Sequence, residues 1–254
     1  MEHDKPSRRN FIKATSLASV TLNIPHLVSV ALKEEKLMSK IKLSKSDIIL
    51  FQGDSITDSG RKKEDANSNT PEALGNGYAV LTAAQLLERN ADKRLTIYNR
   101  GLSGNKVFQL AERWEKDTLQ LKPNVLSILV GVNDYWHTLL SGYAGTVKTY
   151  HDDLHKLLKN TKAALPDVKL IIGEPFALKG VKAVSPSWFP VFYDYQKAAK
   201  EIANEYKAVF IPYQSIFDKA LKVAPGAYWT HDGVHPTLAG ANLMASAWMH
   251  TVKA

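Results

Sequence analysis

The chain has 254 residues, 44% hydrophobic and 23% charged, and it contains no cysteine. This length and composition favour one globular domain with a full hydrophobic core, and they exclude disulfides and cysteine-based metal sites. The formal net charge is +8, but the lysines are scattered along the chain. Scattered basic charge is typical of a solvated surface rather than of a nucleic-acid-binding track, so we expect no nucleic-acid partner.

The first 31 residues differ in character from the rest. A basic stretch, Ser7-Arg8-Arg9-Asn10-Phe11-Ile12-Lys13, precedes a mildly apolar segment that ends at Ser29-Val30-Ala31. That segment is too polar for a stable membrane span, and the order basic, apolar, small is typical of an export signal. The basic stretch resembles the twin-arginine signal, which addresses folded proteins to the twin-arginine translocon. An ordinary basic N-terminus or a short amphipathic helix are the alternatives.

We therefore predict an export signal over 1–31, a linker over 32–46 and one catalytic domain over 47–254. The expected location is periplasmic or extracellular, with the translocon as a partner during export and no stable membrane span after processing.

From residue 47 onward, apolar runs alternate with amphipathic segments. The run Ile48–Phe51 ends at Gly53 and is typical of a buried strand, whereas the polar stretch 61–76 indicates a loop. Further strands are predicted over 95–98, 125–130, 169–173 and 209–211, and helices over 78–88, 107–114, 147–165, 187–207, 214–223 and 237–252. This alternation predicts an α/β fold with a five-stranded parallel sheet covered by helices on both faces, which is a three-layer sandwich.

Small and amide residues follow three of these strands. Ser55, Gly104 and Asn133 each come shortly after a strand, and the carboxyl ends of parallel strands meet at one edge of the sheet. A fourth segment, just before the last helix, places Asp232 three residues before His235. At that spacing the carboxylate can hold one imidazole nitrogen while the other nitrogen faces Ser55.

Four sequence blocks carry a family resemblance. They are Gly53-Asp54-Ser55-Ile56-Thr57, the glycine in Asn99–Gly104, Gly131-Val132-Asn133-Asp134 and Asp232-Gly233-Val234-His235-Pro236. In this order they resemble the blocks of the SGNH hydrolases, also called GDSL esterases, over nearly all of residues 47–245. The resemblance implies a flavodoxin-like SGNH hydrolase fold and a serine esterase without a cofactor or metal.

The resemblance also implies a role for each matching residue. Ser55 is the expected nucleophile, His235 the general base and Asp232 the carboxylate that orients it. The backbone N–H groups of Ser55 and Gly104 and the side-chain amide of Asn133 are the expected oxyanion donors. This division agrees with general chemistry, because a serine hydroxyl is a weak nucleophile until a base takes its proton, and the tetrahedral intermediate needs donors already in place.

Several other polar and aromatic residues have a second interpretation. We expect Asp54, Asp58 and Asp134 to hold turns and cap helices rather than to act as acids. His151 and His155 lie four residues apart, but they lack the H-E-x-x-H arrangement and favour a solvated helix face over a metal site. A set of residues remains open between a role at the substrate cleft and a structural role: Trp136, His137, Trp188, Trp229 and His231.

The expected function is an exported serine esterase that acts on a small-molecule or glycan ester, with a carbohydrate acetylesterase favoured. The alternatives are a lysophospholipase, a thioesterase or an arylesterase of the same family, an acyltransferase that forms the same acyl-enzyme, and a non-catalytic glycan-binding member. Fold and catalytic residues do not by themselves name the substrate.

Overall fold

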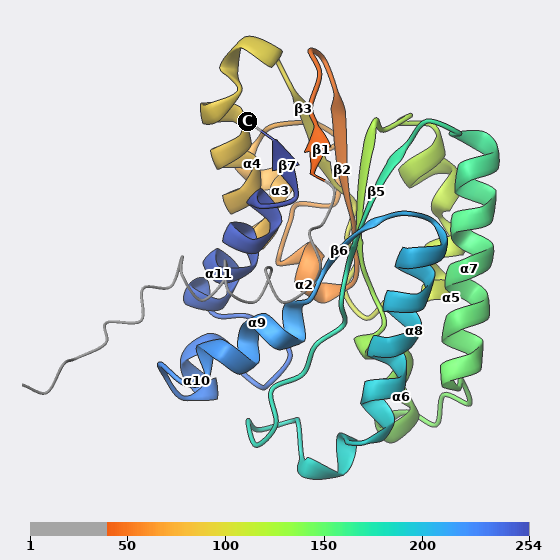
Figure 1. Cartoon of the computed structure of the whole chain (residues 1–254), viewed down its shortest axis with the longest axis vertical. Coiled ribbons are helices and arrows are strands. Elements are labelled where there is room, and N and C mark those ends of the chain that lie inside the picture. The colour runs from red at the N-terminus through yellow and green to blue at the C-terminus, as the bar shows by residue number, and fades with distance from the viewer. Residues whose placement is uncertain (1–39, 254) are drawn as a thin grey trace, which may run out of the picture.

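A computed structural model describes residues 40–253, which are built around one five-stranded parallel sheet (Figure 1). The order in the sheet is β3-β2-β4-β5-β6. The strands are β2 (Ile48–Gly53), β3 (Thr96–Asn99), β4 (Val125–Leu129), β5 (Lys169–Gly173) and β6 (Val209–Ile211). Numbered among themselves along the chain, these strands have the flavodoxin-like order 2-1-3-4-5. The predicted α/β fold is confirmed.

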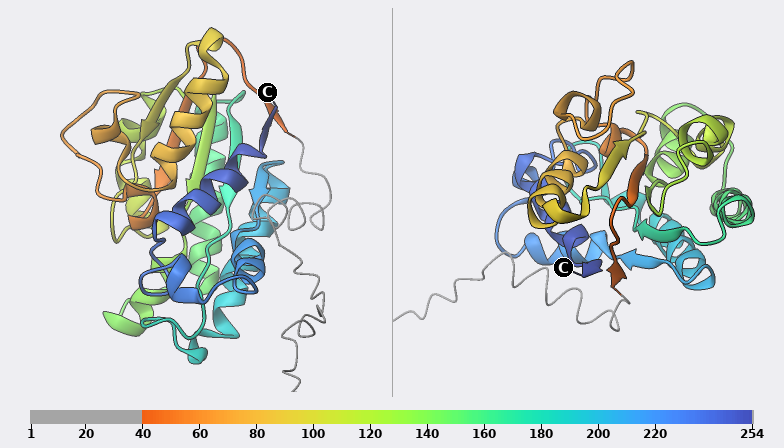
Figure 2. Two further views of the ribbon diagram at one scale, coloured as in Figure 1. Left: turned by 90° about the vertical axis from the view of Figure 1, so that its left-hand side faces the viewer. Right: turned by 90° about the horizontal axis from the view of Figure 1, so that it is seen from above.

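Helices cover both faces of the sheet (Figures 1 and 2). Helices α4 (Tyr78–Arg89) and α11 (Leu238–Met249) lie on one face, and α5 (Val107–Glu112), α7 (Val147–Ala164) and α8 (Val191–Glu205) lie on the other. Trp248 of α11 packs against Phe51 of β2, with ring centroids 5.4 Å apart, and its indole N–H donates to Ser127 of β4 at 3.0 Å. The strand residues are buried from both sides, which explains their nearly continuous apolar runs.

Several short elements did not show in the sequence pattern. They are α2 (Ser55–Asp58), α3 (Pro71–Leu74), α6 (Val132–Leu140), α10 (Gly226–Trp229), and the turns η1 (Ala91–Lys93), η2 (Glu115–Leu119) and η3 (Pro186–Trp188). Helix α9 (Tyr213–Ala220) was predicted over 214–223, and it starts one residue earlier than expected. Helix α3 lies inside the stretch predicted as a loop, where Thr70 caps it and Pro71 occupies its first turn. The helix predicted from residue 187 begins at Val191, because Pro190 disfavours the helical conformation of the residue before it.

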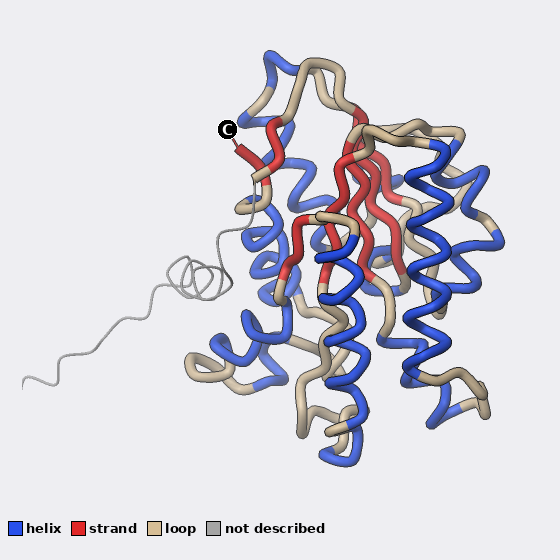
Figure 3. The backbone as a smooth tube through the Cα atoms, turned by 45° about the vertical axis from the view of Figure 1, so that its right-hand side comes forward, coloured by secondary structure: helices blue, strands red, loops and turns tan. Residues whose placement is uncertain are grey.

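The predicted linker contains a strand at its described end. Strand β1 (Ile41–Lys42) pairs in parallel with β7 (Val252–Lys253), and these two form a small sheet apart from the central one (Figure 3). Leu43 is buried, so the folded unit includes residues before 47. The predicted export signal lies outside the described residues. None of the helices between residues 40 and 253 has the length and apolar character to cross a membrane.

Candidate active site

Ser55 lies where strand β2 ends and a short helix begins. Asp54 caps α2 by accepting a hydrogen bond from the backbone N–H of Ile56 at 3.0 Å, so Ser55 becomes the first residue of the helix. The turn depends on Gly53, whose φ is +157° and where an added Cβ would lie 2.2 Å from the carbonyl oxygen of Leu129. The nucleophile turn is therefore pressed against the neighbouring strand β4.

Three side chains form a hydrogen-bonded chain that begins at Ser55. The Oγ of Ser55 lies 2.8 Å from Nε2 of His235, and Nδ1 of His235 lies 2.7 Å from Oδ2 of Asp232. When Nδ1 carries the proton and donates it to the carboxylate, Nε2 is the acceptor for the serine hydroxyl. This geometry is the one that general-base activation of a serine requires.

The segment that carries Asp232 and His235 is held by its own backbone. The Oδ1 of Asp232 accepts from the N–H groups of Val234 at 2.9 Å and His235 at 2.8 Å. Burial by itself raises the pKa of Asp232, but hydrogen bonds from the backbone and side chain of His235 and from Val234 outweigh it, so the net pKa lies below the usual value. The carboxylate thus stays charged beside the imidazole.

The sheet order places the segments of Gly104 and Asn133 on the two sides of the strand that ends before Ser55. Strand β2 has β3 on one side and β4 on the other, and the segments after these two strands contain Gly104 and Asn133. Gly104 has a φ of +81°, a left-handed conformation that favours glycine. Asn133 lies in the first turn of α6 and is buried.

Each group that is expected to bind an oxyanion has an N–H available for a ligand. Among residues 40–253, the backbone N–H groups of Ser55 and Gly104 have no hydrogen-bond acceptor. The amide nitrogen of Asn133 donates one hydrogen bond to the carbonyl oxygen of Asn105 at 3.2 Å, which orients the group and leaves its second N–H for a ligand.

Two buried carboxyl groups flank these residues. Burial raises the pKa of Asp54, next to Ser55, to about 7, and burial likewise raises the pKa of Asp134, next to Asn133, to about 7. Each carboxyl accepts one backbone hydrogen bond through Oδ1, from Ile56 and from Val107 respectively, while its Oδ2 has no partner among the described residues. The expected role in holding turns agrees with these contacts.

The chain was compared with known protein families and structures. The model of the GDSL-like Lipase/Acylhydrolase family matches residues 51–243. The chain belongs to this family. The matched range contains the nucleophile turn, the two donor segments and the Asp232–His235 segment, and this GDSL-like chain is a carboxylic ester hydrolase.

One relative of this GDSL-like hydrolase is an esterase that acts on a carbohydrate. An acetylxylan esterase from Geobacillus stearothermophilus is 31% identical over 217 residues, which cover 84% of this chain and 96% of that protein. Its crystal structure superimposes with a TM-score of 0.76, at 29% identity, over 84% of this chain and 100% of that one. Catalytic mutants of that esterase have been solved with alanine in place of a serine, an aspartate and a histidine. A protein assigned as a GDSL-like lipase from Parabacteroides merdae gives a TM-score of 0.82 at 53% identity, over 84% and 98% of the two chains.

The structure distinguishes the tryptophan beside His235 from the tryptophans that are buried in the core. Trp136 is half-buried with its ring 6.1 Å from that of His235, so this GDSL-like hydrolase has an indole beside the expected base. Trp188 packs behind Trp136 at 5.7 Å and is buried, as is Trp229, so both are structural. The Nδ1 of His137 lies 3.0 Å from Nζ of Lys106. Burial is the larger cause that lowers the pKa of His137, and the positive charge of Lys106 is the smaller one.

Three further histidines, His151, His155 and His231, make contacts of their own. His231 is exposed, and its backbone N–H donates to the carbonyl oxygen of His235 at 2.8 Å. His155 pairs with Glu205 at 2.8 Å, and its ring stacks on that of His151. Within the described range 40–253, no group of three or more His, Asp or Glu side chains is arranged to hold a metal ion.

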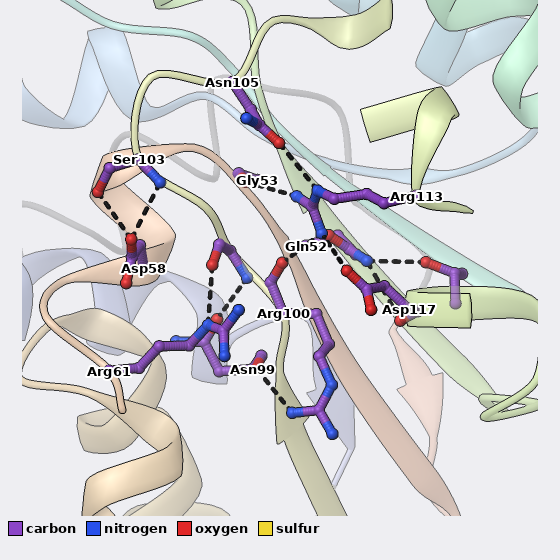
Figure 4. Close-up of polar contacts among 12 residues, drawn as sticks. Gln52, Gly53, Asp58, Arg61, Asn99, Arg100, Ser103, Asn105, Arg113 and Asp117 are labelled. Atoms are coloured by element: carbon purple, nitrogen blue, oxygen red, sulfur yellow. Dashed lines mark hydrogen bonds and ion pairs between the residues drawn. The ribbon is translucent and has the colours of Figure 1, made fainter. Parts of the chain in front are cut away.

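Sequence reasoning missed the polar side chains that support the site (Figure 4). Asp58, expected to hold a turn and cap a helix, accepts from both the N–H and the hydroxyl of Ser103, at 3.0 and 2.7 Å, and this distant partner was not predicted. Arg113 reaches Asn105, and Arg61 donates to the carbonyl oxygen of Gly101 at 2.8 Å. The contact of Asp58 with Ser103 spans 45 positions and that of Arg61 with Gly101 spans 40, while Arg113 reaches Asn105 from the far end of α5, 8 positions away. No local pattern indicates these contacts.

Proposed function

We propose that this esterase removes acetyl groups from glycans, with Ser55 as nucleophile, His235 as general base and Asp232 as the carboxylate that orients the base. The observation that carries the proposal is the hydrogen-bonded chain from Asp232 through His235 to Ser55, at 2.7 and 2.8 Å. The same family's acetylxylan esterase supports the substrate class, since that enzyme covers nearly the whole of the hydrolase domain.

In the first half of the proposed reaction, Oγ of Ser55 attacks the ester carbonyl carbon while Nε2 of His235 takes the hydroxyl proton. The carbonyl oxygen becomes an oxyanion that accepts hydrogen bonds from the N–H groups of Ser55 and Gly104 and from the amide of Asn133. The C–O bond to the sugar then breaks, and His235 gives its proton to the leaving sugar oxygen. The acetyl group remains on Ser55.

In the second half, His235 takes a proton from a water molecule, whose oxygen attacks the acetyl carbon. The oxyanion forms again in the same place, acetate leaves, and the proton returns to the oxygen of Ser55. Asp232 remains ionised throughout and stabilises the imidazolium that forms in each half.

The indole of Trp136 supports a carbohydrate substrate. It lies beside His235, which protonates the leaving sugar oxygen in the proposed reaction, and it is half-buried, so part of the indole is open to solvent. Aromatic faces present a large apolar area with little conformational entropy to lose, which suits the apolar face of a pyranose ring.

We also propose that the protein is exported through the twin-arginine route. The support is the order Ser7-Arg8-Arg9-Asn10-Phe11-Ile12-Lys13 followed by an apolar segment. Replacing Arg8 and Arg9 together with lysine keeps the charge and removes the motif, so we expect the protein to accumulate in the cytoplasm as active enzyme. Undiminished export of this double variant contradicts the twin-arginine route.

A substrate panel tests the glycan proposal. We expect acetate release from acetylated xylan and acetylated xylo-oligosaccharides, and faster turnover of short than of long p-nitrophenyl esters. A preference for long acyl chains contradicts the glycan proposal and points to a lipase-type member. Transfer of acetyl to added xylose in place of release as acetate indicates an acyltransferase. Failure to cleave any ester indicates a binding protein.

A further inference from the structure

We propose that Arg113 is the positioning residue that sets the relative placement of the three oxyanion donors. Arg113 follows α5 and does not face the triad. Its guanidinium instead contacts the segments that carry Ser55 and Gly104, at Gly53 and Asn105 (Figure 4). This proposal rests on the proposed esterase function, because the donors matter only if an oxyanion forms.

The first contact holds the Gly104 turn. The Nε of Arg113 donates to Oδ1 of Asn105, the residue after Gly104, at 2.8 Å. On the other side of the glycine, Ser103 is held by Asp58 through its N–H and hydroxyl. Gly104 itself has no side chain, and at φ +81° its N–H direction depends on these two neighbours. Both neighbours are tied by side chains.

A second link runs through the same asparagine to Asn133. The carbonyl oxygen of Asn105 accepts the hydrogen bond from the Asn133 amide at 3.2 Å. When Arg113 fixes Asn105, it therefore also fixes the acceptor that orients the third donor.

The remaining contacts anchor the guanidinium to strand β2 and to the rest of the fold. Its Nη2 donates to the carbonyl oxygen of Gly53, two residues before Ser55, at 3.4 Å, and Nη1 donates to the carbonyl oxygen of Arg100 at 2.7 Å. The same Nη1 pairs with Asp117 at 2.9 Å. The arginine side chain is only 16% exposed.

One planar guanidinium thus contacts the end of β2 at Gly53, the Arg100 carbonyl and Asn105, and it acts on the third donor, Asn133, through Asn105. Arginine is suited to this because its donors form a rigid fork, whereas a lysine ammonium is a point charge that cannot contact all three segments in fixed directions. A catalytic group displaced by about 1 Å can cost about a hundred-fold in rate. We therefore expect Arg113→Met to lower kcat by about a hundred-fold, with KM changed by less than about three-fold.

The test compares Arg113→Met and Arg113→Lys with a matched control, Arg89→Met, at an arginine on α4 whose side chain is 55% exposed. Each variant is assayed for kcat and KM on p-nitrophenyl acetate, with concentration corrected by active-site titration. The second readout is the rate of inactivation by diethyl p-nitrophenyl phosphate, whose phosphoryl oxygen occupies the place of the oxyanion. We expect inactivation to slow in proportion to kcat, Arg113→Lys to lie between Arg113→Met and wild type, and Arg89→Met to match wild type.

Asn105→Ala provides a second variant if Arg113→Met fails to fold. It removes the 2.8 Å bond from Nε and keeps the backbone carbonyl that Asn133 needs. We expect about a tenfold loss of kcat, since only one of the links to the donors is broken. A folded Arg113→Met or Asn105→Ala enzyme with wild-type kcat and inactivation rate overturns the proposal, and so does a rise in KM at unchanged kcat.

Ser55→Ala, assayed in parallel, separates this proposal from the function on which it rests. An inactive Ser55→Ala together with fully active Arg113 variants overturns only the role of Arg113. A fully active Ser55→Ala overturns the esterase mechanism itself.

Discussion

Replacing Asp232 with asparagine changes one oxygen of the carboxylate to an NH₂ group. On this geometry, the change moves the proton of the neutral His235 imidazole from Nδ1 to Nε2. Oδ1 of Asp232 accepts from two backbone N–H groups, at 2.9 and 2.8 Å, while Oδ2 faces Nδ1 of His235 at 2.7 Å. Only the oxygen of an asparagine amide can accept those two bonds, so its nitrogen must face Nδ1. The imidazole then accepts at Nδ1, carries its proton on Nε2 and cannot take the proton of Ser55.

The size of the effect follows from this loss of the correct tautomer. In a serine–histidine–aspartate triad, the same carboxylate-to-amide change lowers kcat by about ten-thousand-fold, which corresponds to roughly 5.5 kcal/mol of transition-state stabilisation. We expect a similar loss in Asp232→Asn with KM nearly unchanged, because no expected substrate contact is altered. His235→Ala should cost more, since no side chain is left to move the proton.

The assay measures kcat and KM on one acetyl ester for wild type, Asp232→Asn, His235→Ala and the exposed control Asp92→Asn. Thermal unfolding checks that Asp232→Asn stays folded, as the two retained backbone hydrogen bonds predict. An Asp232→Asn enzyme that keeps more than about a tenth of wild-type kcat refutes the tautomer argument. One as inactive as His235→Ala shows that orientation matters as much as proton transfer.

Three further predictions concern the surroundings of the triad. Asn133→Ala should lower kcat by about a hundred- to a thousand-fold with little change in KM, measured on p-nitrophenyl acetate, and a loss below about tenfold removes Asn133 from the oxyanion donors. The pKa of about 7 for Asp54 lies above its usual 3.8, so its neutral form stabilises the fold at low pH, and this contribution falls as pH rises from about 4 to 7. The unfolding free energy of Asp54→Asn relative to wild type, measured in urea, should therefore rise over this range by at most roughly 4 kcal/mol, and a pH-independent difference contradicts the assignment. Trp136→Ala should lower kcat/KM for acetylated xylo-oligosaccharides by about tenfold while p-nitrophenyl acetate is affected less, and an equal loss on both substrates argues against a sugar platform.

The central sheet could be predicted because its strands are buried on both faces. Strands β5 and β6 match their predicted bounds. Both are apolar runs too short for a helix, and they lie between helical segments, so a buried strand is the structure that the sequence indicates. Helix α6 was missed because its exposed positions include Leu139 and Leu140, which obscure the amphipathic pattern. Strands β1 and β7 have two residues each, and they pair across nearly the whole chain, so no local signal exists for them.

The same distinction applies to the site. Ser55, Gly104, Asn133, Asp232 and His235 belong to sequence blocks, and parallel strand ends bring such blocks together whatever lies between them. The contact of Arg113 with Gly53 spans 60 positions, and the contact of Asp58 with Ser103 spans 45. From the sequence alone, Arg113 resembles an ordinary surface arginine after a helix. Only the structure shows that its side chain is buried among carbonyl groups.

The proposed reaction passes through a covalent acetyl-enzyme on Ser55, and rapid-quench mass spectrometry can detect this intermediate. The enzyme is mixed with an acetylated xylo-oligosaccharide, quenched in acid within the first turnover, digested and sequenced by mass. We expect one acetyl group on the peptide that contains Ser55, absent from Ser55→Ala and decaying as acetate appears. An acetyl group on another residue, or acetate release with no acetylated peptide at any time point, contradicts it.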